Sequence, residues 1–299
     1  HGTNRRQRQM CIRDRFMPIF KKLSANRKQK VLPSVDKKIL LSWNCLYIKG
    51  LIKLYKITKE ENILKAINKA LDFITNRMVS SETIYSCFNE EPCFPGYLDD
   101  YALLGSVLID YLSIEWNQNY YDTCMRVCDD LMNNFEDKEK GGFFFTSDQH
   151  EQLFYRPKSI SDDSVPSGLV YATDMLLYMG FISGNQKYIE AAYGALDFIY
   201  KSIDDNLTSS VSAINLLRED NLEKEIIIVR TNKKTWEKIT DSEEYYGRCI
   251  IFIENELQNL PDYIAYKESK GEFTSYHCKG MTCQTPKLSF EDFIDSLKT

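Results

Sequence analysis

The stretch KAINKALDFI, residues 65–74, decides the fold, because it returns as EAAYGALDFI at residues 190–199. Both copies place apolar residues at helical spacing, and both contain the run Ala-Leu-Asp-Phe-Ile. The second copy starts 125 residues after the first, which is about two periods of roughly 60 residues. A repeat of this kind predicts stacked helical hairpins, each of which buries its apolar face against the next.

Three such hairpins are predicted along the chain. The same apolar spacing covers residues 39–74, 98–135 and 166–203, and each range is interrupted once by a polar break, TKEE, EWNQN or SGNQ. The linkers 80–97 and 136–165 are rich in turn residues and aromatics. Because long structured loops at one end of a rigid scaffold often carry binding residues, we expect a site at this end.

The pattern changes after about residue 220. Short β-like runs, EIIIVR and RCIIFIE, flank a predicted helix, KKTWEKI, and an amphipathic helix, SFEDFIDSL, follows near the end. The opening HGTNRRQRQMCIRDR has no hydrophobic periodicity and is typical of non-native or disordered sequence. The predicted domains are therefore a tail at 1–18, a helical part at 19–220 and a small α/β region at 221–299.

Charge and composition exclude several classes of protein. Residues 1–30 hold ten of the 38 basic residues and one of the 43 acids, which leaves a net charge of −14 on residues 31–299. Such an acidic body predicts no nucleic-acid partner, because that affinity depends on Lys and Arg. No apolar run reaches the roughly 18 residues of a membrane span. We expect a soluble, cytoplasmic protein with no membrane partner.

Nine cysteines without a C-x-x-C motif favour a reducing compartment. Cys278 and Cys283 would form a redox pair or, less well supported, bind a metal together with His277. No Gly-rich phosphate loop or nucleophile elbow is present. The prediction is that the protein holds no cofactor and no metal.

Acidic residues precede the first helix of each hairpin. They are Asp36, the pair Asp99 and Asp100, and the pair Asp162 and Asp163. The spacing from Asp36 to Asp100 is 64 residues and from Asp100 to Asp162 is 62, so stacked hairpins would bring them to one rim. An Asp at a helix start ordinarily caps free backbone N–H groups. Alternatively, Asp36, Asp100 and Asp162 are catalytic carboxylates of the kind that act on sugars.

Other residues near the expected rim are candidates for binding a substrate. Trp43, Asn44 and Tyr101 lie at helix starts beside the acids, and Asp99 is the other acid of the pair with Asp100. Arg156 and Lys158 flank Pro157 in the linker 136–165. Aromatic faces stack on sugar rings, although aromatics at helical spacing are more often core residues. The two basic residues would bind an anionic group or pair with the rim acids.

Five segments resemble, in this order, the spermatogenesis-associated protein 20-like family of thioredoxin-domain-containing proteins. They are LSANRKQKVLPSVDKKILLSWN, GYLDDYA, GGFFFT, YRPKSISDDSVPSG and YHCKGMTCQTP, and the resemblance covers roughly residues 19–299. The resemblance implies a thioredoxin-like domain, absent from this chain, followed by an (α/α)6 toroid of the six-hairpin glycosidase type. It also implies a second acid next to Asp36, where this chain has Lys37.

The expected fold class is therefore mainly α, a partial (α/α)6 toroid of helical hairpins with a small C-terminal α/β appendage. Three hairpins cannot close a six-hairpin ring, so one apolar helical flank would be exposed. The resemblance implies function by analogy only. Our hypothesis is a carbohydrate-binding or carbohydrate-active domain, with glycoside hydrolase, lyase or epimerase chemistry and a sugar ligand. The alternative is a non-catalytic scaffold or protein-interaction module for a thioredoxin-like domain.

Overall fold

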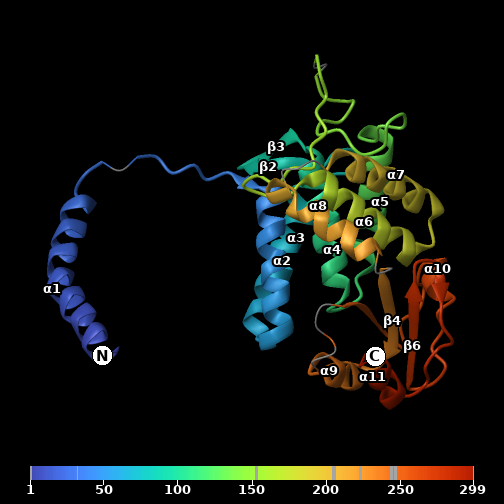
Figure 1. The fold of residues 1–299 in the computed structure, drawn as a ribbon. Coiled ribbons are helices and arrows are strands. Elements are labelled where there is room, and N and C mark those ends of the chain that lie inside the picture. The colour runs from blue at the N-terminus through green and yellow to red at the C-terminus, as the bar shows by residue number, and fades with distance from the viewer. Residues whose placement is uncertain are drawn as a thin grey trace. The chain divides into compact units, whose positions relative to one another are not determined.

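The computed structural model describes residues 2–31, 33–151, 154–203, 207–221, 224–242, 245 and 248–298. The chain forms two units, one up to Lys38 and one from Ile39 onward. The first unit contains helix α1, Gly2–Lys28 (Figure 1). This helix includes described residues of the segment 1–18, for which a non-native or disordered tail stays a prediction. The side chains of residues 14–31 are exposed, in agreement with the lack of hydrophobic periodicity at the start of this helix.

The second unit begins with three helical hairpins, which confirms the mainly helical prediction and its repeat. Each hairpin consists of two consecutive helices: α2 (Leu41–Thr58) and α3 (Glu61–Arg77), α4 (Leu98–Leu112) and α5 (Gln118–Asn134), and α6 (Gly168–Ser183) and α7 (Gln186–Ser202). The polar breaks between paired helices contain residues that favour helix ends and helix starts. Gly184 takes the left-handed conformation after α6, and the side chains of Asn117 and Asn185 cap α5 and α7.

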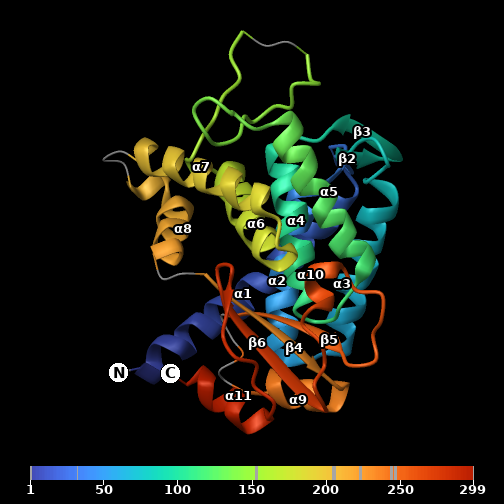
Figure 2. The same ribbon diagram turned by 90° about the vertical axis from the view of Figure 1, so that its right-hand side faces the viewer.

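Helix α4 lies at the centre of the helical layer, where it contacts α2, α5 and α6 (Figure 2). Nearly every side chain of α4 and α6 is buried, as their almost continuous apolar sequences require. Gly105 allows the close approach of these two helices, because a Cβ at this position would overlap Met175 of α6. The first helices of the three hairpins, α2, α4 and α6, therefore form a contiguous row.

A small antiparallel sheet joins two strands of the linker 80–97, where the sequence indicated only turns and aromatics, to a short strand before α2. It contains β1 (Ile39–Leu40), β2 (Tyr85–Asn89) and β3 (Glu91–Pro95), in the order β1-β2-β3. Cys87 on β2 faces Cys93 on β3, and the two form a disulfide. The pairing differs from the reduced cysteines that the sequence favoured.

The C-terminal region has the predicted α/β character. Its elements are α8 (Val211–Asn221), preceded by the turn η1 (Leu207–Ser209), and then β4 (Glu225–Thr231), α9 (Lys233–Thr240), β5 (Cys249–Glu254), α10 (Asp262–Ala265), β6 (Phe273–Lys279), β7 (Thr282–Cys283) and α11 (Phe290–Leu297). The sheet order is β5-β4-β6-β7, with only β4 and β5 parallel. Cys278 and Cys283 pair across β6 and β7 as a disulfide, one of the two alternatives left open by the sequence.

This sheet lies at one end of the helical hairpins and is buried on both faces (Figures 1 and 2). Successive residues of β4 alternate between the faces, so that Ile226 and Ile228 join the helical core while Ile227 and Val229 pack with Trp236 of α9. The sequence predicted a separate region from residue 221. The structure instead places residues from Ile39 onward in one compact unit.

One face of α2 carries large apolar side chains that are exposed, as expected for a hairpin array with an open flank. Trp43, Tyr47, Leu54 and Ile57 are spaced by four, seven and three residues, which places them on one face, and they are 60%, 68%, 44% and 66% exposed, respectively. Among the described helices, none combines the length and the apolar character that crossing a bilayer requires.

Candidate functional site

Three of the acids predicted at the rim, Asp99, Asp100 and Asp162, accept hydrogen bonds from backbone N–H groups at helix starts. Asp100 accepts from the backbone N–H of Tyr97 at 3.0 Å, which caps its own helix α4. Its other carboxylate oxygen accepts from the backbone N–H of Ser42 at 3.1 Å, in the first turn of α2. Asp100 is 4% exposed. Burial raises its pKa to about 6, although these hydrogen bonds oppose the shift.

Asp99 and Asp162 extend this pattern to the next two helices. The backbone N–H of Gly168, the first residue of α6, donates to Asp99, and a Cβ on Gly168 would collide with that carboxylate. Asp162 accepts from the backbone N–H of Ser167 at 3.0 Å and from the backbone N–H of Ser212 at 2.8 Å, and the Ser212 hydroxyl also donates to it. These acids therefore connect the starts of α2, α4, α6 and α8.

Asp36 lies in the first unit, whereas the other acids lie in the second. Its carboxylate is exposed, accepts a hydrogen bond from the Lys38 backbone N–H at 3.1 Å and forms an ion pair with the Lys38 side chain at 3.2 Å. The structure thus brings Asp99, Asp100 and Asp162 to one end of the hairpins, while catalytic roles for Asp36, Asp100 and Asp162 stay predictions.

The predicted substrate-binding residues at the helix starts have separate surroundings. Trp43 is exposed on α2, and the side-chain amide of Asn44 donates to the carbonyl of Leu40 at 2.7 Å. Tyr101 is buried, with its ring 5.0 Å from that of Phe135. Tyr101 therefore has the core position that helical spacing favours, and a binding role for these three residues stays a prediction.

The two basic residues predicted to bind a substrate, Arg156 and Lys158, contact other parts of the linker 136–165 and the end of α5. Arg156 donates to the backbone carbonyls of Thr146 and Asn134, and its guanidinium lies 4.3 Å from the centre of the Phe144 ring. Lys158 forms an ion pair with Asp137 at 2.6 Å, with only about a tenth of each side chain exposed. Both residues therefore have internal partners, but neither partner is one of the rim acids, and a substrate-binding role for Arg156 and Lys158 stays a prediction.

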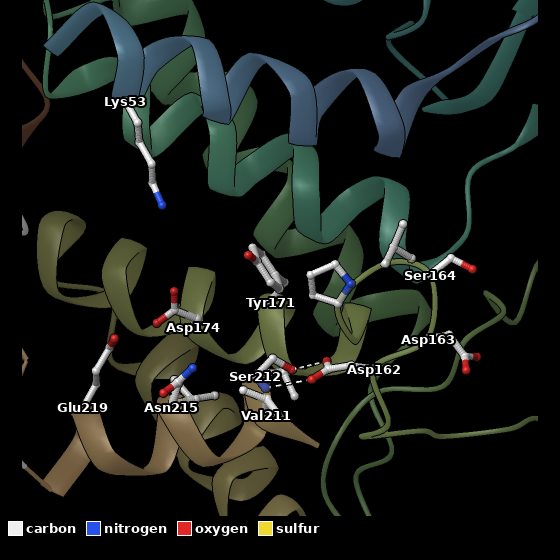
Figure 3. Close-up of a pocket in the computed structure, with 14 residues that line it drawn as sticks. Lys53, Asp162, Asp163, Ser164, Tyr171, Asp174, Val211, Ser212, Asn215 and Glu219 are labelled. Atoms are coloured by element: carbon white, nitrogen blue, oxygen red, sulfur yellow. Dashed lines mark hydrogen bonds between the residues drawn. The ribbon is translucent and has the colours of Figure 1, made fainter. Parts of the chain in front are cut away.

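A hollow lies beside these helix starts, between the row of α2, α4 and α6 and the C-terminal elements α8 and β5. It consists of two adjoining cavities of about 640 and 530 Å³, which share the lining residues Lys53, Tyr171, Asp174 and Glu219. Figure 3 shows the first of them, with Lys53 on one side and Asp174 and Glu219 on the other. We call both cavities together the inner hollow. Their volumes are in the range of small-molecule sites.

One wall of the inner hollow is a network between α2 and α4. The Lys49 ammonium donates to the hydroxyl of Ser106 and to the carboxylate of Asp110, both at 2.6 Å. Burial lowers the pKa of Lys49, but the attraction of Asp110 more than reverses this and holds it above its ordinary value. Lys49 is therefore a fixed cation, and it lies 5.7 Å from the centre of the Tyr171 ring.

The opposite wall is a second network, which connects α6 with α8. The Lys224 side chain, 3% exposed, donates to Asp174 and also to Glu219, the latter at 3.2 Å. Its ammonium lies 4.4 Å from the centre of the Tyr178 ring. Burial raises the pKa of Asp174, although Lys224 opposes the shift. Two carboxylates thus meet at one buried lysine, next to aromatic rings.

This arrangement offers groups that bind hydroxyl-rich ligands. Carboxylates and ammonium groups form charge-assisted hydrogen bonds with hydroxyls, and tyrosine rings pack against apolar ring faces. Asp174 lies midway along α6, away from the helix N-terminus that would lower its pKa. A carboxyl with a raised pKa is the kind that general acid catalysis needs. Asp162 lines the same cavity as Asp174, nearer the helix starts.

Lys49, Asp110 and Asp174, which belong to the two networks of the inner hollow, were not among the site residues predicted from the sequence. The sequence nevertheless contains a pattern that points to them. Asp110 and Asp174 are lone acids within long apolar stretches, LLGSVLIDYL and GLVYATDMLLYMGF. Lys49, Asp110 and Asp174 are separated by 61 and 64 residues, the same period as the acids at the helix starts. Aligning the hairpins by this period would have placed all three at equivalent positions of neighbouring helices.

No protein-family model matches the chain. Among solved structures, a GH76 alpha-mannanase of Bacteroides thetaiotaomicron superposes with a TM-score of 0.48 and 15% identity over 64% of this chain and 55% of that chain. A cellobiose 2-epimerase from Spirochaeta thermophila superposes with a TM-score of 0.46 and 12% identity over 55% of this chain and 43% of that chain. These values describe a remote structural likeness.

Sequence similarity extends over more of the chain. Human spermatogenesis-associated protein 20 is 21% identical over 292 residues, which is 89% of this chain and 37% of the human protein. An uncharacterised protein of Caenorhabditis elegans is 26% identical over 56% of this chain and 24% of its own length. The chain thus spans about a third or less of the relatives it matches. The resemblance to the spermatogenesis-associated protein 20-like family is therefore confirmed over most of this chain.

Proposed function

We propose that the inner hollow binds a carbohydrate. The observation that carries the proposal is the lining itself, in which the carboxylates of Asp174 and Glu219 lie across from Lys53, with the Tyr171 ring between the two walls (Figure 3). Sugar sites combine these groups, because a sugar ring presents hydroxyls around its edge and C–H groups on its faces. The volume of either cavity accommodates a monosaccharide or a disaccharide.

For a chemical step, the proposal points to Asp174 as the acid. Its raised pKa suits proton donation, and Glu219, held by the same lysine, supplies a second carboxylate close by. Paired carboxylates on either side of a glycosidic bond are what hydrolysis of sugars requires. Asp100 is buried at the start of α4 with both carboxylate oxygens bonded to backbone N–H groups, which suits it to holding the helices.

Calorimetric titration of a panel of neutral and acidic mono- and disaccharides tests the proposal. Tyr171→Ala removes a ring that lines both cavities, and we expect roughly tenfold weaker binding of any sugar that the wild type takes. Tyr171→Phe keeps the ring and serves as the conservative control. Trp43→Ala, outside the hollow and exposed, should leave the affinity unchanged. If Trp43→Ala weakens binding while Tyr171→Ala does not, the sugar site lies at the rim.

The scaffold alternative is favoured by one observation, namely that Asp99, Asp100 and Asp162 all hold helix starts together. Acids with this purely architectural role need no substrate. The same titration separates the two functions, because a scaffold binds no sugar from the panel, whereas a carbohydrate site binds at least one in the wild type and loses it in Tyr171→Ala.

A further inference from the structure

Three lysines of one helix, Lys49, Lys53 and Lys56 of α2, line the inner hollow, and they differ in what they contact. Lys49 is bonded to Ser106 and Asp110. Lys56 lies over a tyrosine ring, 5.1 Å from its centre. For Lys53, no hydrogen bond and no acid within 4.0 Å is found among the described residues. Figure 3 shows its side chain directed from α2 into the hollow.

Of the other charged groups of the second cavity, Lys56 lies over the Tyr245 ring, and the rest already have partners of opposite charge. Asp110 is bonded to Lys49, and Asp174 and Glu219 are both bonded to Lys224. Arg248 at the start of β5 forms an ion pair with Glu225 at 2.7 Å. These contacts leave the Lys53 ammonium without a nearby carboxylate in a cavity that it lines.

The acids of the first cavity do not supply the missing charge. Asp162 is bonded to Ser167 and Ser212. Asp163 lies at the opposite end of the cavity from Lys53 in Figure 3 and is exposed. An anion at Lys53 would therefore gain a charge-assisted hydrogen bond without displacing an internal partner.

We propose that the ligand of the inner hollow is an acidic sugar, whose carboxylate or phosphate binds the Lys53 ammonium while its ring lies against Tyr171. This proposal rests on the proposed carbohydrate function and names the class of sugar. The bonded lysines and acids of the two walls contact the ring hydroxyls. A neutral sugar fits the same walls but leaves Lys53 unpaired, so it binds more weakly.

Calorimetric titration with three pyranoses of matched ring structure tests the proposal: glucose, glucuronate and glucose 6-phosphate. We expect at least one acidic sugar to bind roughly tenfold or more tightly than glucose, in line with one charge-assisted hydrogen bond. Lys53→Gln should remove this difference and leave all three at the affinity of glucose. Lys69→Gln, an exposed lysine on α3 outside the hollow, is the matched control and should keep the preference.

Inorganic phosphate completes the experiment. If glucose binds as tightly as the acidic sugars, or if Lys53→Gln keeps the preference for acidic sugars, the acidic-sugar inference is overturned and the carbohydrate function stands. If inorganic phosphate binds as tightly as glucose 6-phosphate and Lys53→Gln removes both, Lys53 binds an anion but the carbohydrate function fails. If none of the four compounds binds the wild type, the acidic-sugar inference fails, and the wider panel of mono- and disaccharides decides the carbohydrate function separately.

Discussion

The acids at the helix starts and the acids of the inner hollow differ in the groups they contact. Asp100 and Asp162 accept hydrogen bonds from backbone N–H groups and serine, whereas Asp110 and Asp174 contact lysine side chains. A backbone N–H is fixed by its helix, so an acid bound to it fixes the helix in turn. A lysine side chain is flexible and is able to exchange one acceptor for another. The first set of carboxylates thus suits an architectural role and the second the proposed binding role, and both sets share a spacing of roughly 60 residues.

The largest effect on stability is expected at the helix starts. Asp162→Ala leaves two backbone N–H groups and one hydroxyl without their acceptor, and we expect the free energy of unfolding to fall by about 2–4 kcal/mol. The measurement is chemical denaturation at pH 7. Asp163→Ala in the same loop is the control, because that carboxylate is exposed, and it should change stability by less than about 0.5 kcal/mol. An equal loss of unfolding free energy in both variants would contradict an architectural role for Asp162.

Asp100 should give the helix starts a distinct pH dependence. Its pKa of about 6 in the folded protein lies above the ordinary value of 3.8, so the folded state binds this proton more tightly than the unfolded state. Its contribution therefore becomes more favourable as the pH falls from about 7 to 4. The side chain of Asn at position 100 cannot titrate. The free energy of unfolding of the wild type should therefore rise by up to about 3 kcal/mol relative to that of Asp100→Asn as the pH falls over this range.

Denaturation of both proteins at several pH values measures this difference, and titration of the other groups largely cancels in the comparison. Parallel stability curves for the wild type and Asp100→Asn would show that the buried carboxyl does not change its proton affinity on folding. A difference of opposite sign would mean that folding lowers the pKa of Asp100, as a nearby cation would.

Removing one charged group of the inner hollow should lower the free energy of unfolding by less than Asp162→Ala does, because the ion pairs of the hollow are partly exposed. Lys49→Met leaves Asp110 and Ser106 without their donor, and we expect a loss of about 1–3 kcal/mol. The double variant Lys49→Met, Asp110→Leu removes both charges and should be more stable than Lys49→Met alone. Lys69→Met on the exposed face of α3 is the control for the substitution itself. A double variant less stable than the single one would mean that the pair stabilises the fold.

Much of the helical layer could be predicted from the sequence because its information is local. Apolar spacing and polar breaks gave the three hairpins, and the acids before each first helix were identified as candidate caps. The sheet of β1 to β3 was missed, since its pairing depends on Ile39 and Phe88 meeting across about 50 residues. The shared core of β4 and the helices was missed for the same reason, because alternation within EIIIVR does not say what either face meets.

The candidate site was predictable at the level of the rim and not at the level of the hollow. Asp99, Asp100 and Asp162 were named because helix starts are visible in sequence, but their backbone partners lie on other helices. Lys49 and Asp110, separated by 61 residues, form a pair only once hairpins are stacked in register. The period that revealed the repeat contains this information, since it aligns charges within apolar helices as well as acids before them.

The smallest effect on stability is expected at Lys53. Its contrast with Lys49 distinguishes a lysine that stabilises the fold from one that does not. Because Lys53 is exposed and forms no ion pair or hydrogen bond with the described residues, Lys53→Gln should change the free energy of unfolding by less than about 0.5 kcal/mol. Lys49→Met, one helical turn away, should cost several times more. Denaturation of both variants measures the contrast. A large loss at Lys53 would assign it to the architecture, whereas a neutral change is what the proposed anion-binding role of Lys53 requires.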